Sequence, residues 1–424
     1  VSPNQRLSLQ VAEGSLKEHF FLGVGPANYG YAFSMFRPEE YNQGPLYSLR
    51  FYQGTGIFFE SLSTIGLIGT ALLFVIWLSF LSVGLYLLSS EKEKNKYLSL
   101  GLWTASVMLF IAAFTAPLNG TLVMIGALLS ALAWALLFKE SGTEERYYSL
   151  SLKASPKYAL ALAFIFMLVS AGVAFLFVFV GKAYMADVAV GKAARLSANG
   201  PQKESVALLT GALAKNPEEG RYYTRLGQEL LGLANVEARK SEQDRDKAQL
   251  EQNLRSAVAL ATQGKNHMPN DVLAVESLAL VYENGSLYAS DAIEKAEENY
   301  ARASELEPTN PILLVKQGQM KRSLGDAKKE GDADKVGSYQ ESETLLKAAT
   351  EKKPDLAAAL YNLSVTQSRL KETEDAIKSV SEALRYDRNN INFKFNLGVL
   401  YQIRDKEGAK ERSEALFKEV RKTN

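Results

Sequence analysis

Three long stretches without a charged residue constrain the fold of this chain more than any other feature. They cover residues 61–90, 97–138 and 158–181. A helix crosses the hydrocarbon core of a bilayer with about 20 apolar residues, so the middle stretch is long enough for two helices separated at Pro117. The sequence therefore predicts four membrane-spanning helices, near Ser63–Leu88, Tyr97–Ala116, Thr121–Phe138 and Tyr158–Gly181.

The overall composition conceals this division into an apolar and a polar half. The chain carries 48 Lys and Arg against 47 Asp and Glu, and no run of basic residues suggests a nucleic-acid partner. It has no Cys and only two well-separated His residues, His19 and His267. Neither a disulfide nor a thiolate or histidine metal site is predicted, and we expect no cofactor.

The basic residues between the predicted helices indicate their orientation. Lys residues lie in 91–96, and both Lys and Arg lie in 139–157, whereas the link 117–120 has none. By the positive-inside rule the two basic loops are cytoplasmic. We therefore expect a multi-pass protein of the cytoplasmic membrane whose N-terminal segment and whose residues after Gly181 are extracytoplasmic. Because Val1 leads directly into a Gly-rich and aromatic segment, we expect further membrane helices upstream.

A spacing pattern recurs in the charged half of the chain. A small residue is followed after three positions by a large apolar residue, after two more by Ala, and after four more by Pro. The copies are Ser205, Leu209, Ala212 and Pro217; Ala296, Tyr300, Ala303 and Pro308; Ser342, Leu346, Ala349 and Pro354; and Ala376, Val380 and Ala383, where Arg388 replaces Pro. Small residues let two helices approach closely, and Pro stops the second helix of a pair.

This pattern resembles the tetratricopeptide repeat family over about Tyr184–Val420. The step from Leu363 to Leu397 is 34 residues, which is the period of that family. The resemblance implies five or six helix pairs that bind a protein partner. Longer units carry their extra residues in polar segments such as 237–247 and 325–337, where insertions between helices belong. We therefore predict an all-α protein, with a polytopic transmembrane helix bundle followed by a tetratricopeptide α-solenoid.

Any chemistry is expected from the N-terminal segment, residues 1–56, which reads as an extracytoplasmic loop rich in Gly and aromatic residues. The expected domains are this loop, the four helices within 57–181, and the repeats of 182–424. Arg side chains grip phosphate oxygens and aromatic rings stack on sugars. A loop of this composition at the outer membrane surface suits a lipid-linked pyrophosphate glycan.

Three short motifs in this region resemble the O-antigen ligase and polymerase family of membrane glycan transferases. A Gly-x-Gly-x3-Tyr turn is matched by Gly23, Gly25 and Tyr29. An Arg-Pro in the large external loop is matched by Arg37 and Pro38, and a closing motif by Ile65, Gly66 and Gly69. The resemblance covers about Gly23–Leu88. It implies transfer of a glycan from a polyprenyl-pyrophosphate donor to a glycan, lipid or protein acceptor.

One position departs from the family. The catalytic His implied by the resemblance falls on Thr55, which cannot act as an imidazole base. Another base, or Glu60 at the mouth of the first predicted helix, then has to accept the proton, or the activity is altered. The alternative role for Glu60 is that of an acid favoured at a helix N-terminus by the helix dipole.

The remaining candidate site residues have two interpretations each. Arg37 and Arg50 either clamp the donor pyrophosphate or pair with Glu39, Glu40 or lipid head groups. Candidate glycan contacts are Tyr31, Tyr41, Asn42 and Tyr52. The tyrosines could instead form an interfacial aromatic belt, which is the role favoured for most aromatics of this segment. The Asp332-Ala333-Asp334 spacing resembles a metal-binding Asp-x-Asp but is predicted to be a solvated turn.

Two function classes follow. In the first, the chain belongs to a glycan ligase or polymerase whose repeats recruit the acceptor or a partner enzyme. In the second, the membrane helices only anchor a repeat scaffold that organises envelope proteins. The resemblance favours the first class, whereas the apolar spans and the repeat spacing fit both.

Overall fold

The computed structural model describes residues 2–90, 96–117, 120–140, 156–286, 291–404 and 408–423, and within these ranges the chain is helical and contains no strand. The chain forms two compact units. The first comprises Val1–Pro38 with Arg50–Gly181, and the second comprises Glu39–Leu49 with Lys182–Asn424. Of the basic residues that predict the orientation, those of 91–95 and 141–155 lie outside the described residues.

The N-terminal segment is not the loop that its Gly and aromatic content predicted. It contains helix α1 (Gln5–Glu18), helix α2 (Tyr29–Phe36) and a short 3-10 helix, η1 (Glu39–Gln43). Asn4 starts α1 because its side chain accepts a hydrogen bond from the amide of Leu7. Helix α2 ends at Phe36, and Arg37 after it has the extended backbone that a following proline favours. Irregular backbone lies between these helices and in residues 44–56, which lead into the first apolar helix.

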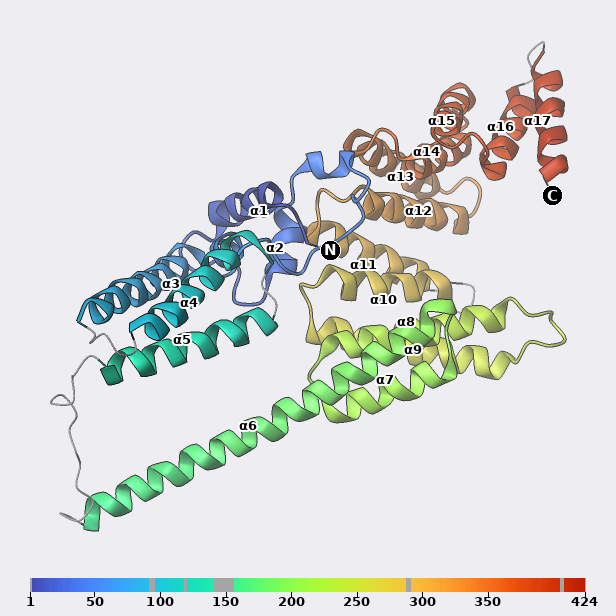
Figure 1. Ribbon diagram of the computed structural model, residues 1–424. Coiled ribbons are helices and arrows are strands. Elements are labelled where there is room, and N and C mark those ends of the chain that lie inside the picture. Colours follow the sequence, from blue (N-terminus) through green and yellow to red (C-terminus); the bar gives the residue numbers. More distant parts are fainter. Residues whose placement is uncertain are drawn as a thin grey trace. The chain divides into compact units, whose positions relative to one another are not determined.

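Four apolar helices confirm the predicted number of spans. They are α3 (Ile57–Ser90), α4 (Lys96–Thr115), α5 (Gly120–Glu140) and the first part of α6 (Pro156–Leu196). Helices α3, α4 and α5 pack side by side (Figure 1). Helices α3 and α4 come close together at Gly84, which leaves room for the Trp103 ring. A Cβ added to Gly84 would lie 2.1 Å from the indole nitrogen of Trp103. The side chains of residues 160–180 in α6 are all exposed, which is suited to lipid and not to water.

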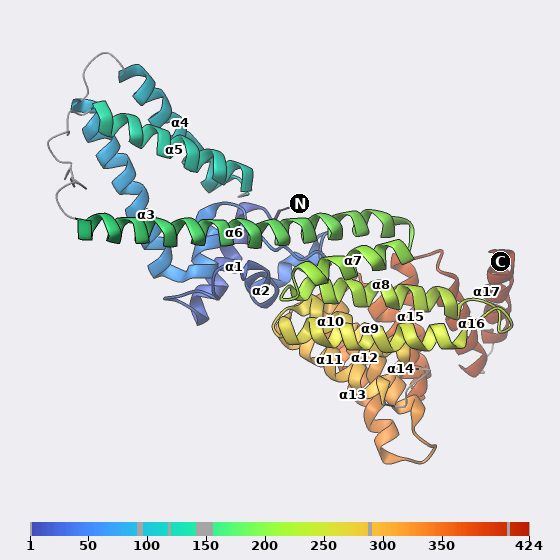
Figure 2. The same cartoon turned by 90° about the horizontal axis from the view of Figure 1, so that it is seen from below.

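The charged half of the chain is a series of antiparallel helix pairs, as predicted. Each helix packs against the next along the chain (Figures 1 and 2). The end of α6 leads into α7 (Lys203–Lys215), and the pairs that follow are α8 (Gly220–Ala238) and α9 (Lys247–His267); α10 (Val272–Gly285) and α11 (Ala292–Leu306); α12 (Pro311–Ala327) and α13 (Ala333–Lys352); α14 (Ala357–Arg369) and α15 (Thr373–Tyr386); and α16 (Ile391–Arg404) and α17 (Ala409–Thr423).

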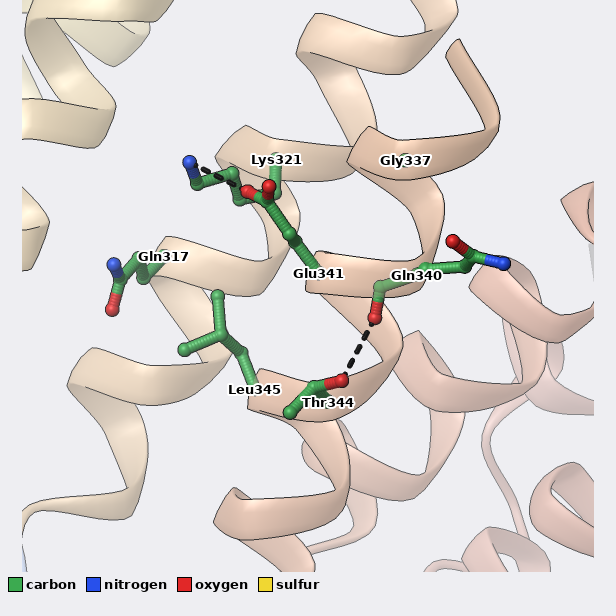
Figure 3. Close-up of a pocket in the computed structure, with 7 residues that line it drawn as sticks. All are labelled: Gln317, Lys321, Gly337, Gln340, Glu341, Thr344 and Leu345. Carbon is green, nitrogen blue, oxygen red and sulfur yellow. Dashed lines mark hydrogen bonds and ion pairs between the residues drawn. The ribbon is translucent and has the colours of Figure 1, made fainter. Parts of the chain in front are cut away.

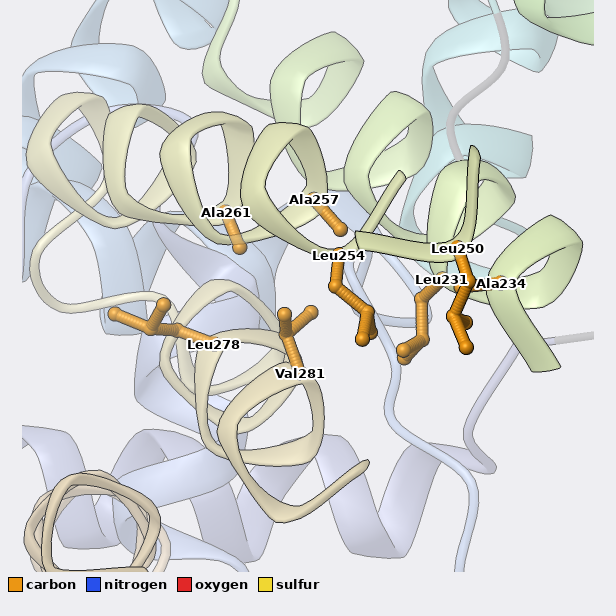
Figure 4. Packing of buried hydrophobic residues seen from close by; sticks show 8 residues of the cluster. All are labelled: Leu231, Ala234, Leu250, Leu254, Ala257, Ala261, Leu278 and Val281. Atoms are coloured by element: carbon orange, nitrogen blue, oxygen red, sulfur yellow. The ribbon is translucent and has the colours of Figure 1, made fainter. Parts of the chain in front are cut away.

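The spacing pattern marks the contact side of the second helix in each pair. All its small and large apolar members in α7, α11, α13 and α15 are buried, with at most 1% of each residue exposed. Helix α9 carries a copy that sequence reasoning missed, Ala257, Ala261, Gly264 and Pro269, because Ala stands where a large residue is expected. In this part of the repeats Leu231, Leu254 and Leu278 fill the space instead, between α8, α9 and α10 (Figure 4).

Side-chain caps define where the repeat helices begin. Asp246, Asp271 and Asn310 each accept a backbone hydrogen bond from the first turn of α9, α10 and α12, respectively. Asp332 does the same for α13 by accepting from the amide of Asp334. The Asp-x-Asp spacing is therefore a helix start, whereas the sequence predicts a solvated turn.

Residues Glu39–Leu49 belong to the repeat unit, although both flanking segments belong to the membrane unit. We call these residues the strap. The side-chain amide of Asn42 donates to the carbonyl of Thr309 at 2.8 Å, in the turn between α11 and α12. The ammonium of Lys353, in the turn between α13 and α14, donates to the carbonyl of Asn42 at 2.8 Å. The strap thus bridges the Pro-containing turns of two successive repeats.

Candidate functional site

Helix α3 is broken at Gly66, close to its N-terminal end. Gly66 has φ 66° and ψ −167°, a conformation that is almost restricted to glycine. The 33-residue span Ile57–Ser89 is about 50 Å long at 1.5 Å per residue, whereas the hydrocarbon core is about 30 Å thick. The part after the break is long enough to cross the membrane alone. The turns before Gly66 can therefore lie at the membrane surface.

The loop 20–25 satisfies the backbone groups that the break sets free. The amides of Val24 and Gly25 donate to the carbonyls of Ser63 and Thr64, at 3.0 and 2.8 Å. On the other side of the break, the amides of Leu67 and Ile68 donate to the carbonyls of Phe20 and Phe21, at 3.0 and 3.3 Å. Non-helical backbone at a membrane is tolerated only where protein or a polar cavity covers it. The loop provides this cover.

The backbones of Gly23 and Gly66 pass so close to each other that neither residue has room for a side chain. A Cβ added to Gly23 would lie 2.6 Å from the amide nitrogen of Gly66, and one added to Gly66 would lie 2.5 Å from that of Gly23. The first and last of the three family-like motifs therefore meet in space. Their glycines have a structural role, since two backbones pass here without room for a side chain.

Polar side chains gather at the first turn of α3 and just before it. A carboxylate oxygen of Glu60 accepts a hydrogen bond from the amide of Gly54 at 3.1 Å. The amide of Thr55 donates to the hydroxyl of Ser8 on α1 at 2.9 Å, and the hydroxyl of Thr55 donates to the carbonyl of Pro3. Thr55 thus ties this turn to the N-terminal helix, and Glu60 is half-buried beside it. The contribution of α1 to the cluster was not apparent from the sequence.

Tyr29 completes the cluster. A Cβ added to Gly54 would lie 3.2 Å from both Tyr29 Cζ and Glu60 Cβ, so the phenol and the carboxylate flank the same glycine. Tyr29 is fully buried, and its hydroxyl has no hydrogen bond of normal geometry among the described residues. Burial raises the pKa of Tyr29 to about 12; Ser8 is near enough to lower it slightly, and the charge of Glu60 raises it further.

The Tyr29→Phe variant is expected to change how stability depends on pH. Near neutral pH the two proteins should be equally stable or the variant slightly more so, because an unpaired buried hydroxyl is removed. Above pH 10 the unfolded wild type ionises while folded Tyr29 stays neutral up to about pH 12. Wild-type stability should therefore fall relative to the variant, by about 2 kcal/mol at pH 12. Thermal unfolding in detergent at pH 7 and pH 11.5 tests this, and parallel curves would contradict it.

The two candidate arginines lie at the two ends of the strap, in the membrane unit. Arg37 is the residue after α2 and is only 2% exposed, so its guanidinium is held inside the protein and is not displayed on the surface. A buried guanidinium requires charged or polar partners. Arg50 is half-buried and follows the strap directly. Glu39, an alternative partner at the sequence level, pairs with Lys352 at 2.8 Å.

The structure divides the candidate glycan contacts between the two units. Tyr31 and Tyr52 belong to the membrane unit, where Tyr52 is 52% exposed and its ring packs on Gly30. Tyr41 and Asn42 belong to the strap. The Tyr41 hydroxyl donates to the carbonyl of Leu46 at 2.6 Å, and the side-chain amide of Asn42 is committed to Thr309. Asn42 is fully buried, which disfavours a direct contact with a glycan.

A surface groove of about 510 Å³ lies between α12 and α13 (Figure 3). Lys321 projects into it and forms ion pairs with Glu341 at 2.8 Å and with Glu297 at 3.4 Å. The groove is lined by Gln317, Lys321, Gly337, Gln340, Glu341, Thr344 and Leu345. Because its charged groups neutralise one another, the groove offers a mixed polar surface rather than a site for a particular charge.

A second, smaller cavity of about 250 Å³ lies among the membrane helices. Its walls come mainly from α4 and α5, including Ala113, Gly126 and Ala127, with Ile57 of α3 at one side. It is lined mainly by apolar residues, with Ser106 and Ser130 as its polar members, so a charged group would be disfavoured there.

No protein-family profile matches this chain, and no curated protein matches it. Solved tetratricopeptide and related structures resemble its repeat unit. One, described as "MamA 41-end from Desulfovibrio magneticus RS-1", is 15% identical with a TM-score of 0.35, and the match covers 48% of this chain and 97% of that one.

Two further structures are similar to the repeats. "YrrB: a TPR protein with an unusual peptide-binding site" is 15% identical with a TM-score of 0.35, covering 50% of this chain and 90% of that one. TTC0263, described as a thermophilic TPR protein in Thermus thermophilus, is 18% identical with a TM-score of 0.35, covering 46% and 89%. At TM-scores below 0.5 these likenesses carry no argument of their own, and the tetratricopeptide-like architecture rests on the helix packing described above.

Proposed function

We propose that this chain is the site-bearing part of a membrane glycan transferase of the O-antigen ligase type, with its repeats acting as a protein-binding scaffold. The observation that carries the proposal is the broken N-terminal part of α3, with Glu60, Tyr29 and Thr55 clustered before the break. A helix that only anchors a protein needs no break and no buried polar cluster. Broken helices with polar surroundings are typical of membrane proteins that handle polar substrates.

In the proposed reaction, an acceptor hydroxyl attacks the anomeric carbon of a polyprenyl-pyrophosphate-linked glycan. Glu60 accepts the proton of that hydroxyl while the new carbon–oxygen bond forms. The bond to the pyrophosphate breaks at the same time, and the lipid pyrophosphate leaves with the electron pair. Arg37 and Arg50 stabilise the charge that develops on the leaving group, Arg50 from a half-buried position and Arg37 from inside the protein. Thr55 holds the turn in place and takes no part in proton transfer.

The proposed location is the outer face of the cytoplasmic membrane, with the repeats on the extracytoplasmic side. The support is the pattern of basic residues between the spans, which predicts that the N-terminal end of the first span, where the break lies, is extracytoplasmic. Tyr31 and Tyr52 are proposed to contact the glycan, because both lie in the membrane unit with the polar cluster.

Glu60→Gln is the variant that tests the proposed chemistry. Glutamine keeps the shape and can still accept the hydrogen bond from Gly54, but it cannot take a proton. Transfer from a lipid-linked donor should fall by about 100-fold or more. The matched control is Glu13→Gln on the exposed face of α1, which should leave transfer unchanged. Equal activity of the Glu60→Gln protein and the wild type would remove Glu60 from the mechanism.

Arg37→Ala is expected to abolish transfer, but it also empties a buried site and can lower stability. Arg37→Lys is therefore measured beside it, since it keeps the charge and loses the planar fork that binds phosphate oxygens. Both variants must show the wild-type amount of folded, membrane-inserted protein before transfer is compared. Full activity in Arg37→Lys would mean that charge alone, without the fork, is sufficient.

The second candidate function is a membrane-anchored scaffold without catalysis. It is favoured by the uninterrupted series of helix pairs from α8 to α17, which is suited to holding a protein partner. In cells, a scaffold should keep its envelope phenotype when Glu60 is replaced by Gln, whereas a transferase should lose it. A phenotype that survives Glu60→Gln and is lost only when the repeats are removed would favour the scaffold.

A further inference from the structure

The strap is held on the repeats by contacts at both of its halves. In its first half, Glu39 pairs with Lys352, and Asn42 is bound through its side chain and its carbonyl. In its second half, the ring of Tyr47 lies under the ammonium of Lys353, 4.4 Å from the ring centre. The strap also binds itself, since the Tyr41 hydroxyl donates to the carbonyls of Leu46 and Leu49, at 2.6 and 3.2 Å.

We call these contacts between the strap and the repeats the dock, and Lys353 is its central residue. It is only 5% exposed, and its ammonium is shared among the carbonyl of Asn42, the ring of Tyr47 and the carboxylate of Asp355 at 2.8 Å. An ammonium carries three hydrogen-bond donors and a compact positive charge. The carbonyl and the carboxylate can accept two of these hydrogen bonds, and the ring face interacts with the charge. Removal of the ammonium takes this donor away from the carbonyl of buried Asn42.

The ends of the strap lie directly beside the two candidate arginines. Arg37 is two residues before Glu39, so its Cα is at most about 7 Å from that of Glu39. Arg50 directly follows Leu49, whose carbonyl is fixed by Tyr41. If the strap were undocked, both arginines would be attached to a free 11-residue segment and would gain conformational freedom.

We propose that the repeats position Arg37 and Arg50 through the strap, and that Lys353 and Asn42 are the positioning residues. This inference rests on the proposed function for the role of the two arginines in binding pyrophosphate. The repeat unit then has a direct effect on the membrane unit, in addition to any partner that it binds. Lys353 itself never touches substrate.

The test uses the full chain in lipid nanodiscs with three single variants and the Lys353→Met/Asn42→Ala double variant. Lys353→Met keeps the aliphatic stem and removes the ammonium. Asn42→Ala removes the bond to Thr309 from the other side of the dock. The matched control is Lys347→Met, which removes an exposed lysine of the neighbouring helix α13. Hydrogen exchange of residues 39–49 should become at least tenfold faster in the first two variants and stay unchanged in the control.

The accessibility of Arg37 and Arg50 is the deciding readout. If the dock held only the strap and did not position the arginines, their accessibility would not change. Phenylglyoxal labelling, followed by mass spectrometry, measures the exposure of each guanidinium without any glycan. Arg37 should be almost unreactive in the wild type and at least tenfold more reactive in Lys353→Met and Asn42→Ala. The double variant should resemble the single ones, because both act through the same strap. Unchanged labelling of Arg37 and Arg50, despite faster exchange of the strap, would overturn the inference.

Transfer kinetics distinguish this inference from the proposed function. If the wild type transfers glycan, the strap variants should lower kcat by at least tenfold, with hydrogen exchange of α12–α14 unchanged. Normal kcat with an undocked strap would overturn positioning and leave the transferase intact. If the wild type transfers nothing, the transferase proposal fails, whereas the labelling result still decides whether the strap positions the arginines.

Discussion

The Gly66→Ala variant should lose at least about 3 kcal/mol of stability and much of its folded yield. An alanine at φ 66° and ψ −167° is strained by about 1–3 kcal/mol in any surroundings. In addition, its Cβ would lie 2.5 Å from the carbonyl carbon and oxygen of Phe21 and from the amide nitrogen of Gly23. These are backbone atoms that cannot turn aside, so the loop 20–25 has to move and its four hydrogen bonds to α3 are lost.

Thermal unfolding of the purified protein in detergent measures this effect, with protease accessibility of the loop 20–25 as a second readout. Gly101→Ala on α4 is the matched control, because an added Cβ there meets nothing within 4 Å. The control should be neutral or gain up to about 1 kcal/mol, since alanine favours a helix more than glycine does. Equal unfolding temperatures for Gly66→Ala and the control would show that the break is not required.

Leu346→Ala should destabilise the middle of the repeats by about 2–5 kcal/mol. Leu346 is fully buried on α13 and packs with Val315 and Leu363. Its side chain also occupies the space where a side chain at Gly318 would lie. Removal of its side chain leaves a cavity between rigid helices that cannot close around it. Because repeat proteins are stabilised mainly by neighbouring pairs, the loss should be local to α12–α14.

Hydrogen exchange resolved along the chain checks both the size and the location of the effect. Leu345→Ala is the matched control, since this neighbouring leucine lies at the surface groove and is only half-buried. It should cost less than about 1 kcal/mol. Similar losses in both variants, or a loss spread evenly over all repeats, would contradict the packing described for Leu346.

Hydropathy and spacing predicted the spans and repeats because each depends on residues close in sequence. An uncharged stretch such as 158–181 is long and apolar enough to span a membrane, and the spacing of Ala303 and Pro308 favours a close helix pair. The copy in α9 was missed because Ala261 leaves its gap to be filled by leucines of other helices. A spacing rule describes one helix, whereas the filling of a gap depends on its neighbours.

The candidate site was less predictable than the fold. Gly23 and Gly66 were recognised in two separate motifs, but their contact depends on a break inside an otherwise ordinary helical sequence. Ser8 entered the cluster only because α1 folds back against Thr55. Lys353 and Asn42 lie 311 residues apart, and nothing local to either residue marks it as a partner of the other.

The same separation has a consequence for the order of synthesis. The strap leaves the ribosome 311 residues before Lys353, which is about 15 to 60 s at about 5–20 residues per second. For most of that interval the α11–α12 and α13–α14 turns do not yet exist, and the strap has to wait undocked. If the strap positions the two arginines as proposed, they reach their final positions only after helices α12 and α13 and the turn that follows them have been made. Under that proposal, assembly of the site is a late event that awaits synthesis of the repeats.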